Sequence, residues 1–222
     1  MDWSAFALSL KLAFWTMILL LPLSIAISRQ LAWRPFRGRA LCEALLALPL
    51  VLPPTVLGFY LLVAFGGNSV IGQAYQSLFG KTLAFTFEGL LLASIVFNLP
   101  FAIQPMQRGF ESIPPDVRDA AACCGLGSWQ TFLRVELPLA WPGVVTAMVL
   151  TFAHTLGEFG VVLMIGGSIP GETKTIAIAI YDRVQAFDMN AAAMMSAILL
   201  VISLLAMAMV FATSRQRIHV RS

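Results

Sequence analysis

The sequence predicts an all-α integral membrane protein with five transmembrane helices. Hydrophobic residues make up 59% of its 222 residues and charged residues only 11%, against about 25% charged in ordinary soluble domains. A hydrocarbon core about 30 Å thick is crossed by ~20 mostly apolar residues in a helix. We therefore expect one membrane domain over residues 8–212 and no separate soluble domain. Its predicted spans are 6–27, 41–65, 84–105, 139–165 and 191–212.

The first span is expected to be a retained helix and not a cleaved signal peptide. Asp2 stands where a signal peptide has a basic start, and the apolar stretch 6–27 is too long for one. It also lacks the small-x-small pattern of a cleavage site.

Prolines interrupt the second span at Pro49, Pro53 and Pro54. Each proline removes a backbone donor and frees a carbonyl one turn back. Such breaks are tolerated at membrane depth where protein or a water-filled path satisfies the freed groups. Two interpretations stay open: a bent helix beside a translocation pathway, or a packing kink. In the third span, Asn98, with Ser94 one turn earlier, leaves the same two interpretations open.

Polar residues share one face of the fourth span: Thr151, His154, Thr155 and Glu158 follow helical spacing. A charge at mid-bilayer costs about 2.5–3.5 kcal/mol on insertion scales, so these groups should face protein or water. They either line a pathway or gate, or they are structural. In the structural case His154 and Glu158, four residues apart, pair with each other or with a neighbouring helix.

A polar island interrupts the apolar sequence at residues 116–138, between the third and fourth spans. Asp116 is expected to cap a helix that Gly125 ends. Ser128 is expected to cap a second helix, Trp129–Val135, closed by Leu137-Pro138. Nothing in the island supports catalysis, so it either docks a soluble partner or packs under its own helices. Trp129 is expected at such a docking surface or at the membrane interface.

The positive charges predict the orientation in the membrane. If five helices alternate, three arginine-rich segments fall on one side, and only Lys81, Lys174 and Arg183 fall on the other. Because cytoplasmic loops carry the excess of Lys and Arg, the basic side should be cytoplasmic. The N-terminus is then outside, and the C-terminus and the island are cytoplasmic. The arginines counted on that side are Arg29, Arg34, Arg37, Arg39, Arg108, Arg118, Arg134, Arg215, Arg217 and Arg221.

No enzyme or metal signature is found. Gly80-Lys81-Thr82 ends like a phosphate-binding loop, but Tyr75 stands where the upstream glycine is required. The two histidines, His154 and His219, are far apart and have no cysteine at zinc-like spacing. We therefore expect a non-catalytic chain without metal or cofactor, surrounded by membrane lipid and without a nucleic-acid partner.

The spacing of the island resembles the EAA loop of ATP-binding-cassette import permeases of type I. Asp119-Ala120-Ala121, Gly125 and Val135-Glu136-Leu137-Pro138 match that motif, with Asp for the usual Glu and Val for the usual Ile. The segments 48–58, 154–160 and 169–175 narrow the resemblance to molybdate permeases. The resemblance covers residues 8 to 212.

The resemblance implies the partners and the site residues. A separate cytoplasmic ATPase would bind ATP and Mg²⁺, an extracytoplasmic protein would deliver the oxyanion, and two copies of this chain would form the pathway. The loop that couples to the ATPase would lie at residues 106–138. Its coupling residues would be Asp119, Ala120, Ala121, Gly125, Gly127, Trp129, Val135, Leu137 and Pro138.

The remaining candidates follow from the same picture. Pathway or gate candidates are Ser94, Asn98, Thr151, His154, Thr155, Glu158, Pro53 and Pro54. The external segment 166–190 offers a landing surface for the binding protein, with Gly171, Glu172, Thr173 and Lys174 as candidates, or it is an ordinary loop followed by an interfacial helix at Thr175–Val184. Because a carboxylate repels anions, Glu158 is expected to support structure or gating.

The predicted function is translocation of molybdate across the cytoplasmic (inner) membrane. Tungstate is a further possible cargo. No Lys or Arg lies in the central part of spans two to five, which favours a low-affinity passage with selectivity in the binding protein. A sulfate or thiosulfate permease is the alternative within the same class. A gradient-driven secondary transporter is the alternative from another class, and it would need a titrating carboxylate such as Glu158.

Overall fold

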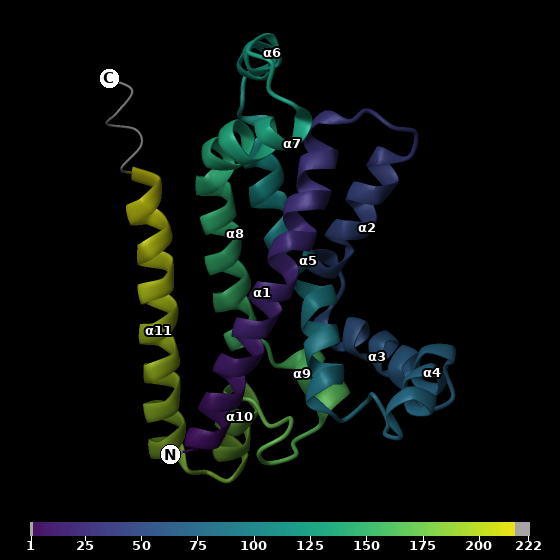
Figure 1. The fold of residues 1–222 in the computed structure, drawn as a ribbon. Coiled ribbons are helices and arrows are strands. Elements are labelled where there is room, and N and C mark those ends of the chain that lie inside the picture. The colour runs from purple at the N-terminus through teal and green to yellow at the C-terminus, as the bar shows by residue number, and fades with distance from the viewer. Residues whose placement is uncertain (1, 216–222) are drawn as a thin grey trace.

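The computed structural model describes the backbone of residues 2–215 and the side chains of residues 2–208. All regular structure in this part of the chain is helical (Figure 1), which confirms the predicted all-α membrane class. Four helices are long and apolar enough to cross a membrane, and a bent pair makes up to five. The elements are α1 (Trp3–Trp33), α2 (Arg39–Val51), α3 (Pro54–Phe65), α4 (Val70–Phe79), α5 (Phe87–Glu111), α6 (Pro115–Cys123), α7 (Ser128–Thr131), the π-helical turn η1 (Phe132–Glu136), α8 (Leu137–Gly157), α9 (Gly160–Gly166), α10 (Ile176–Gln185) and α11 (Met189–Arg215).

The centre of the fold is a bundle of α1, α5 and α8, which pack against one another along most of their length. α5 is the most enclosed of the three and carries buried residues from Gly89 to Phe110. α11 packs against α8 and α10 on one flank, and α2 contacts α5 on the other. Helices in a bilayer associate through van der Waals packing and interhelical hydrogen bonds, so α5, which has the largest buried share, is the element around which the others are placed.

The second predicted span consists of two helices separated by a sharp bend. α2 ends at Val51 and α3 begins at Pro54, with a bend of 111° between their axes. Pro53 is the N-cap of α3 and Pro54 its first residue, where a missing N–H costs nothing. The interruption predicted at the prolines of the span 41–65 is therefore present, because two adjacent prolines end one helix and start another.

The fourth predicted span, 139–165, starts too late and ends too late. The helical path runs unbroken from Ser128 through η1 to Gly157, and α9 is a separate helix. Leu137-Pro138 does not close the island, because Pro138 sits in the first turn of α8. The Leu137 N–H bonds to the Phe132 carbonyl, five residues back. The wide turn thus carries the chain into α8 without a break.

The caps of the island also differ from the prediction. Pro114 is the N-cap of α6, with Asp116 in its first turn, and Gly127 is the N-cap of α7, so Asp116 and Ser128 are not caps. α6 ends at Cys123, and Gly125 follows with φ +76°. The Leu126 N–H then bonds back to the Ala121 carbonyl, as at a left-handed helix stop.

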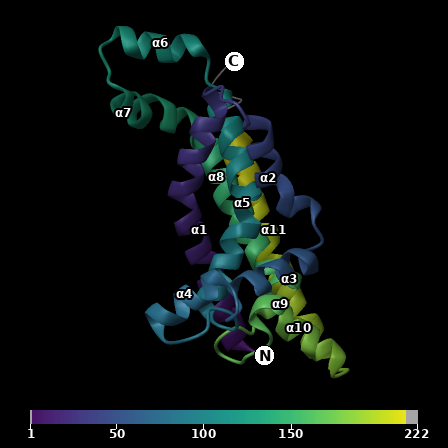
Figure 2. The same ribbon diagram turned by 90° about the vertical axis from the view of Figure 1, so that its right-hand side faces the viewer.

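The two ends of the bundle differ in charge. The loop from α1 to α2, together with α6 and α7, lies at one end, and the N-terminus, α4 and α10 lie at the other (Figure 1). Seen from the side, α6 and α7 project beyond the bundle (Figure 2). The arginine-rich segments predicted to share a side therefore do so within the described residues; Arg217 and Arg221 lie outside them.

The closest approach in the central bundle depends on two glycines. A Cβ on Gly143 of α8 would lie 2.6 Å from the Pro105 carbonyl oxygen of α5, and Gly109 faces it from α5. At Gly157, at the end of the same helix, an added Cβ would meet nothing within 4 Å.

Gly143→Ala is expected to destabilise the chain by about 1–3 kcal/mol, because α5 and α8 must move apart. Thermal unfolding in detergent measures this as a lower Tm. Gly157→Ala is the matched control and should leave the Tm unchanged. Equal Tm values for the two variants would contradict the close approach.

Candidate functional sites

A buried carboxylate connects the polar island to the bundle. Glu136, in η1, is 1% exposed. Its Oε2 accepts from Arg29 Nε of α1 at 2.6 Å, and its Oε1 accepts from Arg118 Nε of α6 at 3.2 Å. Both arginines are about one third exposed, so the carboxylate is the buried member of the trio. One side chain thus joins three elements that lie far apart in the sequence.

Aromatic rings enclose this ion trio. The Arg118 guanidinium lies 4.0 Å from the centre of the Trp33 ring, and the Arg29 guanidinium lies 5.3 Å from the Phe132 ring. Cations over aromatic faces gain about 0.5–2 kcal/mol and are partly shielded from water. The island is therefore fixed to the C-terminal end of α1 by charge and by ring contacts together.

The predicted coupling residues divide into exposed and packed ones. Ala121 is buried, and Val135 and Leu137 are half-buried against the bundle. Trp129 is 69% exposed although its ring lies 5.4 Å from that of Phe132. The exposed members give the island a free outer surface, and they are Asp119, Ala120, Gly125, Gly127, Trp129 and Pro138.

An apolar groove of ≈ 560 Å³ separates α7 from α1. Pro22, Ile25 and Ala26 form one wall, and Trp129, Phe132 and Leu137 contribute from the island side. The island thus contacts the bundle through Glu136 and through an apolar cluster in which Val117 and Phe132 pack against Phe110.

Glu136 is the functional candidate that sequence reasoning missed. It falls at the variable position of the Val135-Glu136-Leu137-Pro138 match, so the motif gave it no weight. The available signal was the charge itself, because a carboxylate among apolar residues next to a membrane span requires a cationic partner. Two arginines far away in the sequence meet that requirement.

A second polar site lies inside the bundle around Asn98 of α5. Its Nδ2 donates to Thr155 Oγ1 of α8 at 2.9 Å and to the Ser94 carbonyl at 2.9 Å. Ser94 Oγ accepts from Thr16 Oγ1 of α1 at 2.9 Å. All four side chains are buried. The structure brings the candidates Ser94, Asn98 and Thr155 together in a hydrogen-bonded contact among three helices.

His154 and Glu158 do not pair with each other. His154 Nδ1 lies 3.2 Å from Asn98 Oδ1, and its ring stacks on Phe101 with 3.8 Å between ring centres. Glu158 lies beyond the end of α8, and its Oε1 accepts from the Val161 N–H of α9 at 2.8 Å. The i,i+4 pairing is therefore wrong, because the helix ends at Gly157 and Glu158 caps the next one.

The other pathway candidates, Thr151, Pro53 and Pro54, lie in packed surroundings. Thr151 is buried, and its Oγ1 has no hydrogen-bond partner among the described residues. Pro54 packs against Gly160, where an added Cβ would lie 2.8 Å from Pro54 Cβ. Pro54 thus lies where the start of α3 meets the start of α9, and Pro53 precedes it as the N-cap of α3.

The external candidates form a folded loop before α10. Thr173 is 0% exposed; its Oγ1 donates to the Gly166 carbonyl and accepts from the Ile169 N–H. It therefore shapes the loop and is not available for docking. Gly171 and Glu172 are exposed, and Lys174 pairs with Asp182 at 2.6 Å. The following helix, α10, agrees with the helix predicted at Thr175–Val184.

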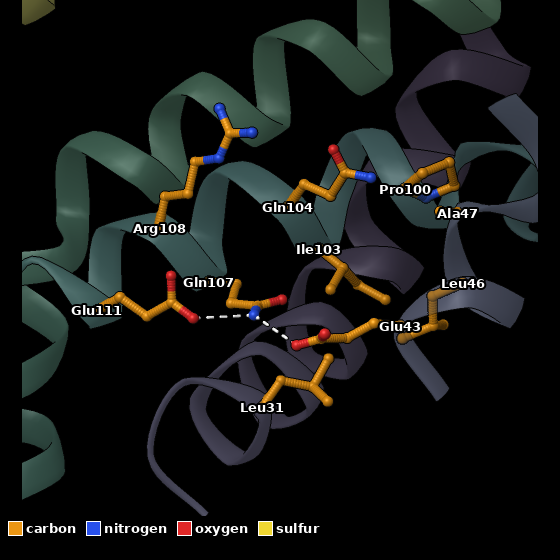
Figure 3. Close-up of a pocket in the computed structure, with 10 residues that line it drawn as sticks. All are labelled: Leu31, Glu43, Leu46, Ala47, Pro100, Ile103, Gln104, Gln107, Arg108 and Glu111. Atoms are coloured by element: carbon orange, nitrogen blue, oxygen red, sulfur yellow. Dashed lines mark hydrogen bonds between the residues drawn. The ribbon is translucent and has the colours of Figure 1, made fainter. Parts of the chain in front are cut away.

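Two further grooves flank α5 near the island end. One, of ≈ 340 Å³, lies towards α2 and contains a hydrogen-bonded chain from Glu43 through Gln107 to Glu111 (Figure 3). The other, of ≈ 460 Å³, lies between α5 and α8. Among residues 2–208 no group of three or more potential ligands could hold a metal ion.

Glu136→Gln is expected to lower the free energy of unfolding by about 1–3 kcal/mol, since it removes the charge that holds two arginines. Thermal unfolding in detergent measures the loss. Glu172→Gln, at an exposed carboxylate, should change the Tm little. A double-mutant cycle with Arg118→Gln should show coupling, and strict additivity would contradict the ion trio.

Comparison with known proteins places this geometry in a family. Residues 18–218 match the family described as "Binding-protein-dependent transport system inner membrane component". The molybdenum transport system permease protein ModB of Azotobacter vinelandii is 50% identical over 187 residues, 84% of this chain and 83% of that protein. The probable sulfate transport system permease protein cysT of Chlorella vulgaris is 33% identical over 201 residues, 90% of this chain and 75% of that protein.

A solved transporter has the same fold. The bacterial alginate ABC transporter, in complex with an alginate pentasaccharide-bound periplasmic protein, aligns with a TM-score of 0.76 at 18% identity. The alignment covers 96% of this chain and 78% of that chain. The chain therefore belongs to the family of binding-protein-dependent transport system inner membrane components, and its fold is that of an ABC importer permease.

Proposed function

We propose that this chain is the membrane-spanning subunit of an ATP-driven importer that translocates molybdate across the cytoplasmic membrane. The observation that carries the proposal is the Glu136 ion trio. Within an exposed, motif-bearing island it joins Arg118 of α6 to Glu136 at 3.2 Å, and it ties Glu136 to Arg29 of α1 in the central bundle at 2.6 Å. A force applied to α6 would therefore reach the bundle through charged contacts, which a loop that only covered the helices would not need.

The choice of cargo rests on similarity. This chain is 50% identical to a molybdenum permease and 33% identical to a probable sulfate permease. Molybdate and sulfate are both tetrahedral divalent anions, so one passage suits either. Tungstate shares the same shape and charge. Sulfate or thiosulfate is the second candidate cargo, favoured by this chemistry and by the lower of the two identities.

The partners follow from the family and from the exposed island. A cytoplasmic ATPase would bind the outer surface of α6 and α7 and would hold the ATP and Mg²⁺. An extracytoplasmic oxyanion-binding protein would dock at the opposite end, where Gly171 and Glu172 are exposed. The N-terminus would then be outside and the C-terminus cytoplasmic.

Two copies of this chain would enclose the pathway. α2 has no buried residue, and α3 buries only Gly58 and Phe65. Helices of this kind that border a pathway need a second surface to pack against, and a twofold copy supplies it. Within such a pair the Asn98 cluster would hold α1, α5 and α8 as one rigid unit, and Glu158 would hold α9 at the end of α8.

Reconstitution tests the proposal directly. The chain is co-isolated with its soluble partners, placed in vesicles, and supplied with molybdate-loaded or sulfate-loaded binding protein. Uptake of molybdate is expected only with ATP, and ATP consumption should rise with the molybdate-loaded protein. Sulfate uptake alone would reassign the cargo, and a complex without any ATPase would contradict the proposal.

Glu158→Gln separates this function from gradient-driven transport, which requires a titrating carboxylate. The amide oxygen of glutamine can still accept from the Val161 N–H, so ATP-dependent uptake should stay within about twofold of wild type. Glu158→Ala, which removes the cap, should cost about 0.5–2 kcal/mol of stability. Loss of uptake in a stably folded Glu158→Gln variant would favour the gradient-driven mechanism.

A further inference from the structure

α5 is longer than the sequence predicted, and its extension places an arginine beside a groove. The helix continues to Glu111, six residues past the expected end of the span at 105. Arg108 lies in this last part and lines the groove of ≈ 460 Å³ between α5 and α8. Gln104, one turn earlier on the same face, lines it as well, and both residues also border the groove of ≈ 340 Å³ towards α2. A cation is therefore present in the wall of the bundle, although the centre of the spans has none.

The carboxylates nearby are engaged elsewhere. Figure 3 shows Glu43, Gln107 and Glu111 linked on one side of α5, with Arg108 and Gln104 directed away from them. Glu43 and Glu111 are both paired with Arg39, at 2.9 Å and 3.4 Å. Arg108 itself forms no ion pair within the part of the chain whose side chains are described. Its charge is thus free to attract an anion.

The chemistry of the groove suits an oxyanion. The Arg108 guanidinium presents several N–H donors in a planar fork that matches two oxygens of one anion. The Gln104 amide can add a further donor. Among the groove residues no carboxylate is present to repel an anion, and the remaining walls are mainly proline and apolar side chains: Leu50, Pro100, Phe101, Pro105, Pro142, Gly143, Thr146 and Leu150.

We propose that a tetrahedral divalent oxyanion binds transiently in this groove against Arg108 and Gln104, as a low-affinity site at the island end of the passage. The proposal deepens the proposed function and rests on it for the direction of transport. One arginine balances only half of a divalent charge, and the Arg108 side chain is exposed to water. Both facts favour weak binding, which a release site requires.

The alternative is that Arg108 acts only on its own helix. A cation in the last turn of a helix interacts favourably with the helix dipole, and positive charge at this end helps to set the orientation. Those roles would make the arginine useful without any anion in the groove. The two explanations differ in one respect. Only an anion-binding site makes the groove favour negatively charged molecules, and this preference can be measured with charged and neutral reagents that enter the groove.

A cysteine in the groove measures that preference. Cys42, Cys123 and Cys124 are all exposed, so each is first replaced by serine. Thr146→Cys then places one thiol in the groove wall of the full-length chain, purified with its co-isolated subunits. Its modification rate is measured with an anionic methanethiosulfonate that carries a sulfonate and with a neutral methyl methanethiosulfonate. The ratio of the two rates reports the local preference for anions and cancels differences in access.

Arg108→Gln is expected to lower the rate ratio about tenfold, since one nearby cation concentrates anions to that extent. Arg108→Lys should keep most of the ratio, and Arg37→Gln, an exposed arginine in the loop between α1 and α2, should leave it unchanged. Millimolar tungstate or sulfate should slow modification by both reagents in the parent, but not in the Arg108→Gln variant.

Three outcomes would overturn the proposal. These are an unchanged ratio in Arg108→Gln, an equal fall in Arg37→Gln, and a thiol at residue 146 that neither reagent reaches. The assay needs neither ATP nor binding protein, so it stands apart from the uptake experiment. If molybdate is taken up but Arg108→Gln leaves the rate ratio unchanged, only the anion site is contradicted. If the groove prefers anions but molybdate is not taken up, the proposed function is contradicted.

Discussion

The rest of the structure depends on how one buried negative charge is balanced. Glu136 is nearly inaccessible to water, and an unpaired carboxylate there would cost several kcal/mol. Arg29 and Arg118 remove that penalty only if α1, η1 and α6 are held close together. The ion trio therefore fixes where the island sits relative to the bundle. A partner that moves α6 must either move α1 with it or break a charged contact.

Prolines set the remaining geometry by position. Pro138 and Pro54 occupy first turns, where the missing N–H has no partner to lose, and there they start helices. Pro53 precedes such a start, and the chain turns through 111° beside it. Pro105, inside α5, lies where Gly143 allows the two backbones to meet closely. One residue type thus initiates, redirects or loosens a helix according to its place.

Much of the fold could be predicted from composition and periodicity, because membrane spans require long apolar stretches. The all-α class, the apolar spans and the interfacial helix α10 follow from such patterns. The errors fall where a local exception decides the path. Neighbouring prolines divided the second span, and the π-helical turn at Phe132–Glu136 joined the island to α8. Neither the bend angle nor the five-residue hydrogen bond has a sequence signature.

The candidate sites were predictable to the extent that they are local. The shared face of Thr151 and Thr155 follows from helical spacing, and Asn98 was a candidate as a polar residue in the third span. Its partners on α8, Thr155 and His154, come from helix packing and could not be deduced. The Glu136 ion trio could not be predicted for the same reason, since its arginines lie 107 and 18 residues away along the chain.

The exposure of α2 shows how far a single copy of the chain can stabilise its own fold. None of its thirteen residues is buried by the chain itself, and its polar contacts with α5 gather around Arg39 and Glu43. Most of the free energy that holds this helix in place must therefore come from surfaces that another molecule, lipid or protein, provides. The isolated subunit is in that sense an unfinished structure, whose shape on this flank is decided by its surroundings.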